Sequence, residues 1–256
     1  GKATYNGALI YANDLEGKVT KIDLTGNYSI DYSGGSNNLT IKEGISTTTL
    51  FDTETTSNNG RNIFTKSSVT INNDNNLWLY FGTGNTQKLR EQSSQIQNRL
   101  YGIKDKDFPN FANISSVGNV SKCTTSECPV PNNKLGWYID LANKQKLTAK
   151  PTVHKDRVFF PIYEPSSGGG SACTTGKAIL TAYGTLCGNS LLNVEVGDGV
   201  LSEVVVQGDN IYIGIGGQAK DNIGQGFTST DNLITGKAGG DSTGGAVQTQ
   251  YWKEID

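Results

Sequence analysis

The chain has 256 residues and a formal net charge of −2, and 32 of its residues are glycine, well above the usual share of roughly 7%. Glycine weakens a helix interior by about 1 kcal/mol relative to alanine, so a helical bundle or coiled coil is disfavoured. The longest apolar runs fall far short of the ~20 residues that span a membrane. The slightly negative charge argues against a nucleic-acid binder.

The first predicted elements are short apolar runs bounded by Gly, Asn and Asp, which is the pattern of strands and turns. Residues 8–12 and 18–24 predict two strands joined by a tight turn at 13–17. Residues 77–81 form a continuous apolar run, which predicts a strand buried on both faces, and 100–103 supplies its return strand. Between them, residues 84–98 are the one stretch compatible with a short helix.

Two further units follow the same plan. Strands are expected at 152–154, 157–163, 176–183, 201–206 and 211–215. The turns Asn72-Asn73-Asp74, Lys155-Asp156 and Gly208-Asp209-Asn210 each precede an aromatic strand, which indicates a degenerate repeat with insertions. Residues 220–250, rich in glycine and polar groups, are expected to form a surface loop.

Repeated hairpins of this kind predict an all-β fold, a partial β-propeller with long inter-strand insertions. Stacking such units around an axis buries both faces of each and leaves few exposed edges. A β-sandwich is the alternative, because it fits the strand lengths equally well.

Four cysteines fall into two local pairs, Cys123 with Cys128 and Cys173 with Cys187. An even number in local pairs favours two disulfides and an oxidising compartment. Zinc is the competing interpretation, although only Cys123 and Cys128 approach the spacing of a zinc knuckle. A third interpretation is that the cysteines are free and buried in the core.

The residues show little catalytic chemistry. The single histidine, His154, has no serine or cysteine motif beside it, and a structural or surface role is favoured. No nucleophile elbow, zincin motif or phosphate-binding loop is present. The nearest approach to a calcium loop is Asn72, Asp74 and Asn76, which has one carboxylate where such loops need several, and a hairpin turn is the preferred interpretation.

The series of motifs resembles the C-terminal propeller of the PilC/PilY family, tip-located adhesins of type IV pili. The motifs span almost the whole chain in family order, and their style is most similar to the Neisseria-type PilC branch. They are Leu9 to Val19 with Ile22-Asp23-Leu24, Trp78 to Gly84 followed by Leu100 to Asp105, Gly136 to Leu141, Lys150 to Pro165, Cys173 to Gly188, and Tyr251 to Glu254.

The resemblance implies a non-enzymatic pilus biogenesis factor and virulence-related adhesin that supports pilus assembly, counters retraction and attaches to host cells. Its implied partners are minor pilins at the pilus tip and a host-cell receptor, with no nucleic acid and no membrane span. Its implied location is extracellular, at the outer-membrane surface or pilus tip. Some family members bind calcium through an Asp-rich loop, which is not intact here, and no other cofactor is evident.

The family propeller is longer than 256 residues. We therefore expect residues 1–256 to be its C-terminal part, with the remaining blades upstream of Gly1. The absence of methionine agrees, because a translated chain starts with Met. Rival functions are a quinone-dependent dehydrogenase, which shares the blade pattern, and a carbohydrate-binding propeller that stacks sugars on Tyr28, Tyr32 or Tyr251. The insertions at 25–65, 104–135 and 220–250 are the expected contact surfaces.

Overall fold

The chain folds into β-sheets in the computed structural model. Residues 9–24, 46–91, 93, 95–108, 134–142, 144–166 and 175–239 are described in full, and 28–31, 38–41 and 120–122 by their backbone. These residues form strands and no helix, which confirms the all-β prediction. In this part of the chain, no helix is long and apolar enough to cross a membrane.

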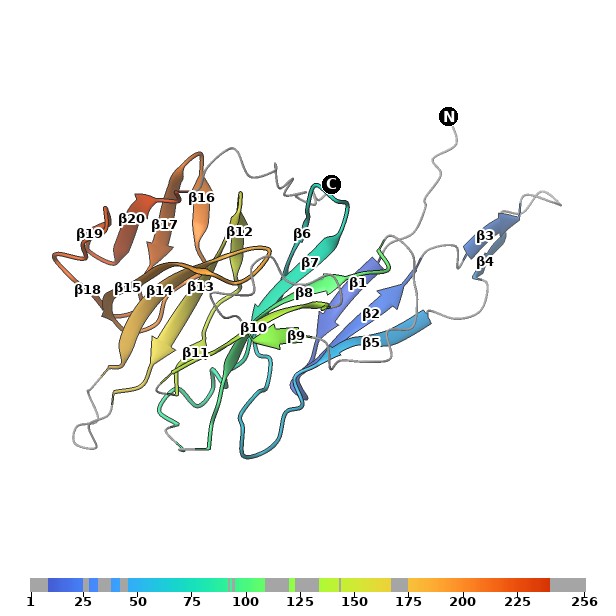
Figure 1. The fold of residues 1–256 in the computed structure, drawn as a ribbon, viewed down its shortest axis with the longest axis horizontal. Helices are drawn as coiled ribbons and strands as arrows, with labels where there is room; N and C mark the ends of the chain where they lie inside the picture. Colours follow the sequence, from blue (N-terminus) through green and yellow to red (C-terminus); the bar gives the residue numbers. More distant parts are fainter. Residues whose placement is uncertain are drawn as a thin grey trace.

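In the described part of the chain, four sheets of three or more strands follow one another in chain order, and a fifth, two-stranded sheet lies within residues 28–41 (Figure 1). Sheet I is β1 (Leu9–Asn13), β2 (Lys18–Asp23) and β5 (Ser46–Asp52). Sheet II is β6 (Ser68–Ile71), β7 (Leu77–Gly82), β8 (Arg99–Asp105), β10 (Gly136–Asp140) and β9 (Val120–Lys122). Sheet III is β11 (Lys146–Leu147) and β12 (Thr152–His154), both beside β13 (Arg157–Glu164), then β14 (Lys177–Gly184), β15 (Ser190–Asp198) and β18 (Gln218–Ala219). Sheet IV is β16 (Val205–Gln207), β17 (Asn210–Gly214), β20 (Leu233–Lys237) and β19 (Thr228–Thr230).

One predicted hairpin lies near the start of each of these sheets. The turns at 72–76, 155–156 and 208–209 join β6 to β7, β12 to β13 and β16 to β17, all antiparallel. The turn at 14–17 joins β1 to β2 in the same way. The recurrent turn before an aromatic strand therefore lies in the first hairpin of sheets II, III and IV, as the repeat predicts.

Three hydrophobic cores lie between consecutive sheets. Core 1 joins sheets I and II through residues such as Phe51 and Phe81. Core 2 joins sheets II and III through Trp137 and Phe160, and core 3 joins sheets III and IV through Leu180 and Ile211. Four sheets stacked in chain order form a propeller-like arrangement rather than a two-sheet sandwich.

Central strands supply two cores at once, because successive residues of a strand point to opposite faces. In β7, Leu79 and Phe81 lie in core 1 whereas Trp78 and Tyr80 lie in core 2. This is why the 77–81 run is continuously apolar. The prediction of a strand buried on both faces is confirmed.

Trp137 of β10 is the largest fully buried side chain in the part of the chain that the structure describes. Its indole N–H donates to the Thr185 carbonyl at 3.0 Å, and the Tyr80 hydroxyl donates to the same oxygen at 3.1 Å. Gly102 and Gly188 leave room for the ring: a Cβ added to them would lie 2.4 Å and 2.8 Å from its atoms. These bonds and contacts join sheet II to the turn that follows β14.

The first strands of these four hairpins form a row that we call the leading edge: β1, β6, β12 and β16. Asn13 bonds the Thr65 carbonyl at 2.9 Å just before β6, and the Ser68 hydroxyl of β6 donates to the Pro151 carbonyl. Thr152 of β12 donates to the Val204 carbonyl at 2.8 Å, just before β16. One side-chain bond or more thus links each strand of the row to the next.

The prediction of a short helix at 84–98 is wrong for the residues that the structure describes there, which form turns. Backbone carbonyls of this segment accept hydrogen bonds from a distant side chain. The buried ammonium of Lys146 lies 2.7 Å from the Lys88 oxygen and 3.2 Å from the Leu89 oxygen. Burial lowers the pKa of Lys146. Carbonyls that accept from this ammonium stabilise a turn in place of a helical ladder.

The prediction of a single surface loop at 220–250 is also wrong in part. β19 and β20 lie within it, and β20 pairs with β17 over five residues from Asn210↔Lys237 to Gly214↔Leu233. Ile234 of β20 is fully buried in core 3. Residues 240–250 lie outside the described part of the chain.

Candidate functional site

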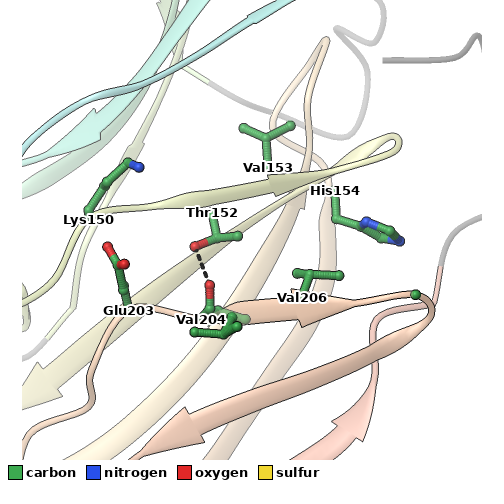
Figure 2. Close-up of a pocket in the computed structure, with 9 residues that line it drawn as sticks. Lys150, Thr152, Val153, His154, Glu203, Val204 and Val206 are labelled. Atoms are coloured by element: carbon green, nitrogen blue, oxygen red, sulfur yellow. Dashed lines mark hydrogen bonds between the residues drawn. The ribbon is translucent and has the colours of Figure 1, made fainter. Parts of the chain in front are cut away.

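A groove of about 440 Å³ lies between β12 and β16 on the leading edge (Figure 2). It is lined by Lys150, Thr152, Val153, His154, Glu203, Val204, Val205, Val206 and Gly208. Figure 2 shows Lys150 and Glu203 near one end and His154 near the other, with Val204 and Val206 between them. The groove therefore has an apolar middle and polar ends, and it runs along two edge strands.

The polar end near the turns is defined by three groups. Lys155 pairs with Asp209 at 2.8 Å, which lowers the pKa of Asp209. His154 Nε2 lies 4.0 Å from the same carboxylate, and its side chain is 18% exposed. Burial, followed by the nearby Lys155, lowers the pKa of His154, so that the neutral imidazole is favoured.

The role expected for His154 agrees with this geometry. It closes the β12–β13 hairpin opposite Arg157, and within the described residues no hydroxyl or thiol is hydrogen-bonded to it. A nucleophile within reach of a base is the signature of covalent catalysis. His154 is a partly buried group at the end of the β12–β13 hairpin, and its structural role stays a prediction.

The candidate cation loop adopts the geometry of a hairpin turn. Asn72 Oδ1 accepts from the backbone amides of Asp74, at 3.1 Å, and Asn76, at 2.9 Å. Asn75 takes the left-handed conformation with φ of 58°. Such side-chain-to-backbone bonds are typical of Asx turns, and calcium binding at Asn72, Asp74 and Asn76 stays a prediction. Within the described residues, no cluster of three His, Cys, Asp or Glu side chains is placed to hold a metal.

Of the four cysteines, Cys123, Cys128 and Cys173 lie outside the described residues. Cys187 is buried in the turn after β14, is disulfide-bonded, and its sulfur lies 3.1 Å from the Asn189 side-chain oxygen. The predicted pairings of Cys123 with Cys128 and of Cys173 with Cys187 stay predictions.

One charged cluster was missed by the sequence analysis. The Lys21 ammonium lies 2.7 Å from Asp105 Oδ2, and both side chains are fully buried between sheets I and II. The Tyr11 hydroxyl donates to the same oxygen at 2.7 Å, and burial, then Asp105, raises the pKa of Tyr11. A signal for Lys21 exists in the sequence, since it shares a strand face with the apolar Val19.

The insertion at 25–65 contains a separate hairpin of β3 (Tyr28–Asp31) and β4 (Asn38–Ile41), which projects beyond sheet I (Figure 1). Its register pairs Tyr28 with Ile41 and Ile30 with Leu39, and Ser29 with Thr40 and Asp31 with Asn38.

The two other insertions are described only in part. Within 104–135, the backbone of β9 pairs in parallel with β10. Tyr32 and Tyr251, two of the three tyrosines suggested for sugar stacking, lie outside the described residues. The backbone of the third, Tyr28, lies in β3.

Comparisons with known proteins give one informative likeness. No protein-family model and no curated protein sequence matches the chain. Among solved structures, the C-terminal domain of PilY1 from Pseudomonas aeruginosa matches with a TM-score of 0.59 and 14% sequence identity. The match covers 90% of this chain and 57% of that one. The chain is therefore similar in fold to the PilY1 C-terminal domain and spans a little over half its length.

Proposed function

We propose that the chain is part of a non-enzymatic type IV pilus-associated protein that supports pilus assembly, counters retraction and attaches to host cells. The observation that carries this proposal is the agreement of two independent comparisons. The motif series in the sequence resembles the PilC/PilY family, and the fold is similar to the PilY1 C-terminal domain over 90% of the chain.

The architecture suits such a role. Three continuous cores and the Lys21–Asp105 pair connect the sheets into a stack that can present loops in fixed positions. The projecting β3–β4 hairpin is the most prominent of these loops in Figure 1. A two-stranded hairpin by itself is marginally stable in water, so contact with another surface would stabilise it.

Secretion to the outer-membrane surface or the pilus tip, and contact with minor pilins and a host receptor, belong to this proposal. Calcium binding belongs to it through the family resemblance alone. The assignment to the Neisseria-type branch of the family rests on the motif style of the sequence.

The test is a set of internal deletions in the full protein, expressed in a piliated host lacking its own copy. Residues 26–44, 109–132 and 220–227 are each replaced by a short Gly-Ser linker, and pilus number and host-cell attachment are counted. We expect attachment to fall at least about tenfold for one deletion or more while surface levels persist. A matched control replaces Leu15 and Glu16, two exposed residues of the β1–β2 turn outside the three insertions, with Gly-Ser.

Unchanged attachment and pilus number in all three deletions would contradict the proposed surfaces. The absorbance spectrum of the purified protein tests the enzymatic rival separately. A bound quinone chromophore would overturn the non-enzymatic assignment, whereas a spectrum of aromatic side chains alone supports it.

A further inference from the structure

The β12–β13 turn of sheet III and the β16–β17 turn of sheet IV meet at Asp209. The Lys155 ammonium of the first turn lies 2.8 Å from Asp209 Oδ1 of the second. The Ala238 amide, just after β20, donates to the Asp209 backbone carbonyl at 2.8 Å. One residue of sheet IV therefore connects the first hairpin of sheet III with the chain that leaves β20. We call this set of contacts, made by Lys155, Asp209 and Ala238, the turn junction.

His154 lies at the same end of the groove as the turn junction (Figure 2). Its Nε2 atom is buried and has no hydrogen-bond partner in the described part of the chain. Asp209 Oδ1 is 4.0 Å from this nitrogen, which is beyond hydrogen-bond distance. Buried polar atoms in native folds are normally hydrogen-bonded. A neutral imidazole suits this position better than a charged one, because it brings no buried charge that needs a partner.

The charges around His154 are balanced without a proton on the ring. Four charged residues face it, namely Lys155, Asp156 and Arg157 of its own hairpin and Asp209 of the β16–β17 turn. Asp209 already has Lys155 at 2.8 Å. Asp156 already has the Arg157 guanidinium at 3.7 Å. An imidazolium would therefore add a positive charge to a cluster in which each carboxylate is shared with a cation.

The other elements near the ring do not offset this charge. β20 adds Lys237, a further cation near Asp209, whose ammonium donates to Asn210 Oδ1 at 2.8 Å. Lys150 and Glu203 line the opposite end of the groove (Figure 2). Burial, followed by Lys155, lowers the pKa of His154 in spite of the two nearby carboxylates.

The turn junction is held by contacts that break at low cost. Asp209 is 69% exposed and Lys155 is 33% exposed in their ion pair, and exposed pairs stabilise a fold only slightly. β16 has three register pairs with β17, whereas β17 has five with β20. Separation of the two turns is thus a local opening that leaves the β17–β20 ladder in place, and local openings cost less free energy than global unfolding.

We propose that the turn junction is an acid-sensitive latch, which is closed while His154 is neutral and opens when its imidazole takes up a proton. Opening gives the charged ring access to water and widens the groove at the end near the turns. The sign follows from linkage. The closed form binds the proton less tightly than the open form, so opening becomes more favourable as the pH falls below about 6.5. This inference is independent of the proposed pilus function.

Amide hydrogen exchange at Ala238, measured by NMR on the full chain, tests the latch. The measured quantity is the protection factor, which corrects for the intrinsic dependence of exchange on pH. We expect the protection of Ala238 to fall at least about threefold between about pH 7 and 5 in the unaltered chain. His154→Gln, whose side chain does not titrate, should show no such fall. Amides of β7 and β8 in sheet II are the control for a local change, and their protection should fall less.

The ring signals of His154, the single histidine of the chain, give a second measurement that needs no variant. The pH midpoint of the shift of the Ala238 amide signal should coincide with the midpoint of the His154 titration. A fall of equal size in His154→Gln would overturn the proposal, and so would two separate midpoints. An equal fall at Ala238 and in β7 and β8 would also overturn it, because the chain would then open as a whole.

Discussion

The buried pair of Lys21 and Asp105 allows a quantitative prediction about stability. Lys21→Met preserves the length and apolar stem of the side chain but removes the ammonium that lies 2.7 Å from the carboxylate. Asp105 then keeps the Tyr11 hydroxyl and, at 3.2 Å, the Asp107 amide as hydrogen-bond donors. An uncompensated buried charge of this kind costs about 3–5 kcal/mol.

That loss is a large part of the stability of an ordinary domain, about 5–15 kcal/mol. At roughly 2–4 °C per kcal/mol for a chain of this size, Lys21→Met should lower the midpoint of thermal unfolding by about 6–20 °C. The measurement is thermal and urea unfolding followed by tryptophan fluorescence. Lys18→Met is the matched control, since Lys18 lies on the same strand in an exposed pair with Glu16 and should change stability little.

A double variant separates the charge from the packing. Lys21→Met with Asp105→Asn removes both charges and retains an acceptor for the Tyr11 hydroxyl, so we expect it to recover a substantial share of the loss. The reasoning is refuted if Lys21→Met is as stable as Lys18→Met. It is also refuted if the double variant loses more free energy of unfolding than Lys21→Met and Asp105→Asn lose together.

Two further predictions concern packing and pH. Gly102→Ala places a Cβ 2.4 Å from Trp137, so we expect about 1–3 kcal/mol of destabilisation with altered tryptophan fluorescence; an unfolding midpoint equal to that of the unaltered chain would contradict it. Burial lowers the folded-state pKa of His154 from the usual 6.5, so the unfolded chain binds its proton more tightly and stability falls as pH drops below about 6.5. His154→Gln should flatten this fall in urea titrations between about pH 7 and 5, and an unchanged slope would count against the assignment.

Much of the fold follows from local pattern. The alternation and turn residues around 9–23, 77–105 and 152–184 predict the strands found there, because hairpins are determined by neighbouring residues. The apolar run at 77–81 also predicts burial on both faces. Its division between two cores depends on sheets far apart in the sequence.

The incorrect predictions, the helix at 84–98 and the single loop at 220–250, also fail because of contacts between residues far apart in the sequence. The turns near 84–98 are stabilised by the Lys146 ammonium, a residue distant in the chain, and lysine is almost never fully buried without partners. Strand β20 lies in a segment of low hydrophobicity, from which Phe227, Ile234 and Ala238 insert into core 3. The groove between β12 and β16 likewise exists only once sheets III and IV pack together.

The packing of the sheets in chain order affects how the molecule folds and unfolds. In the described part of the chain, sheets II and III each border two cores, whereas sheets I and IV each border one. Nearest-neighbour coupling of this type lets structure grow stepwise as the polypeptide emerges, one sheet templating the next. Under a pulling force, the same coupling predicts that the sheets separate one after another, and so a series of discrete extensions.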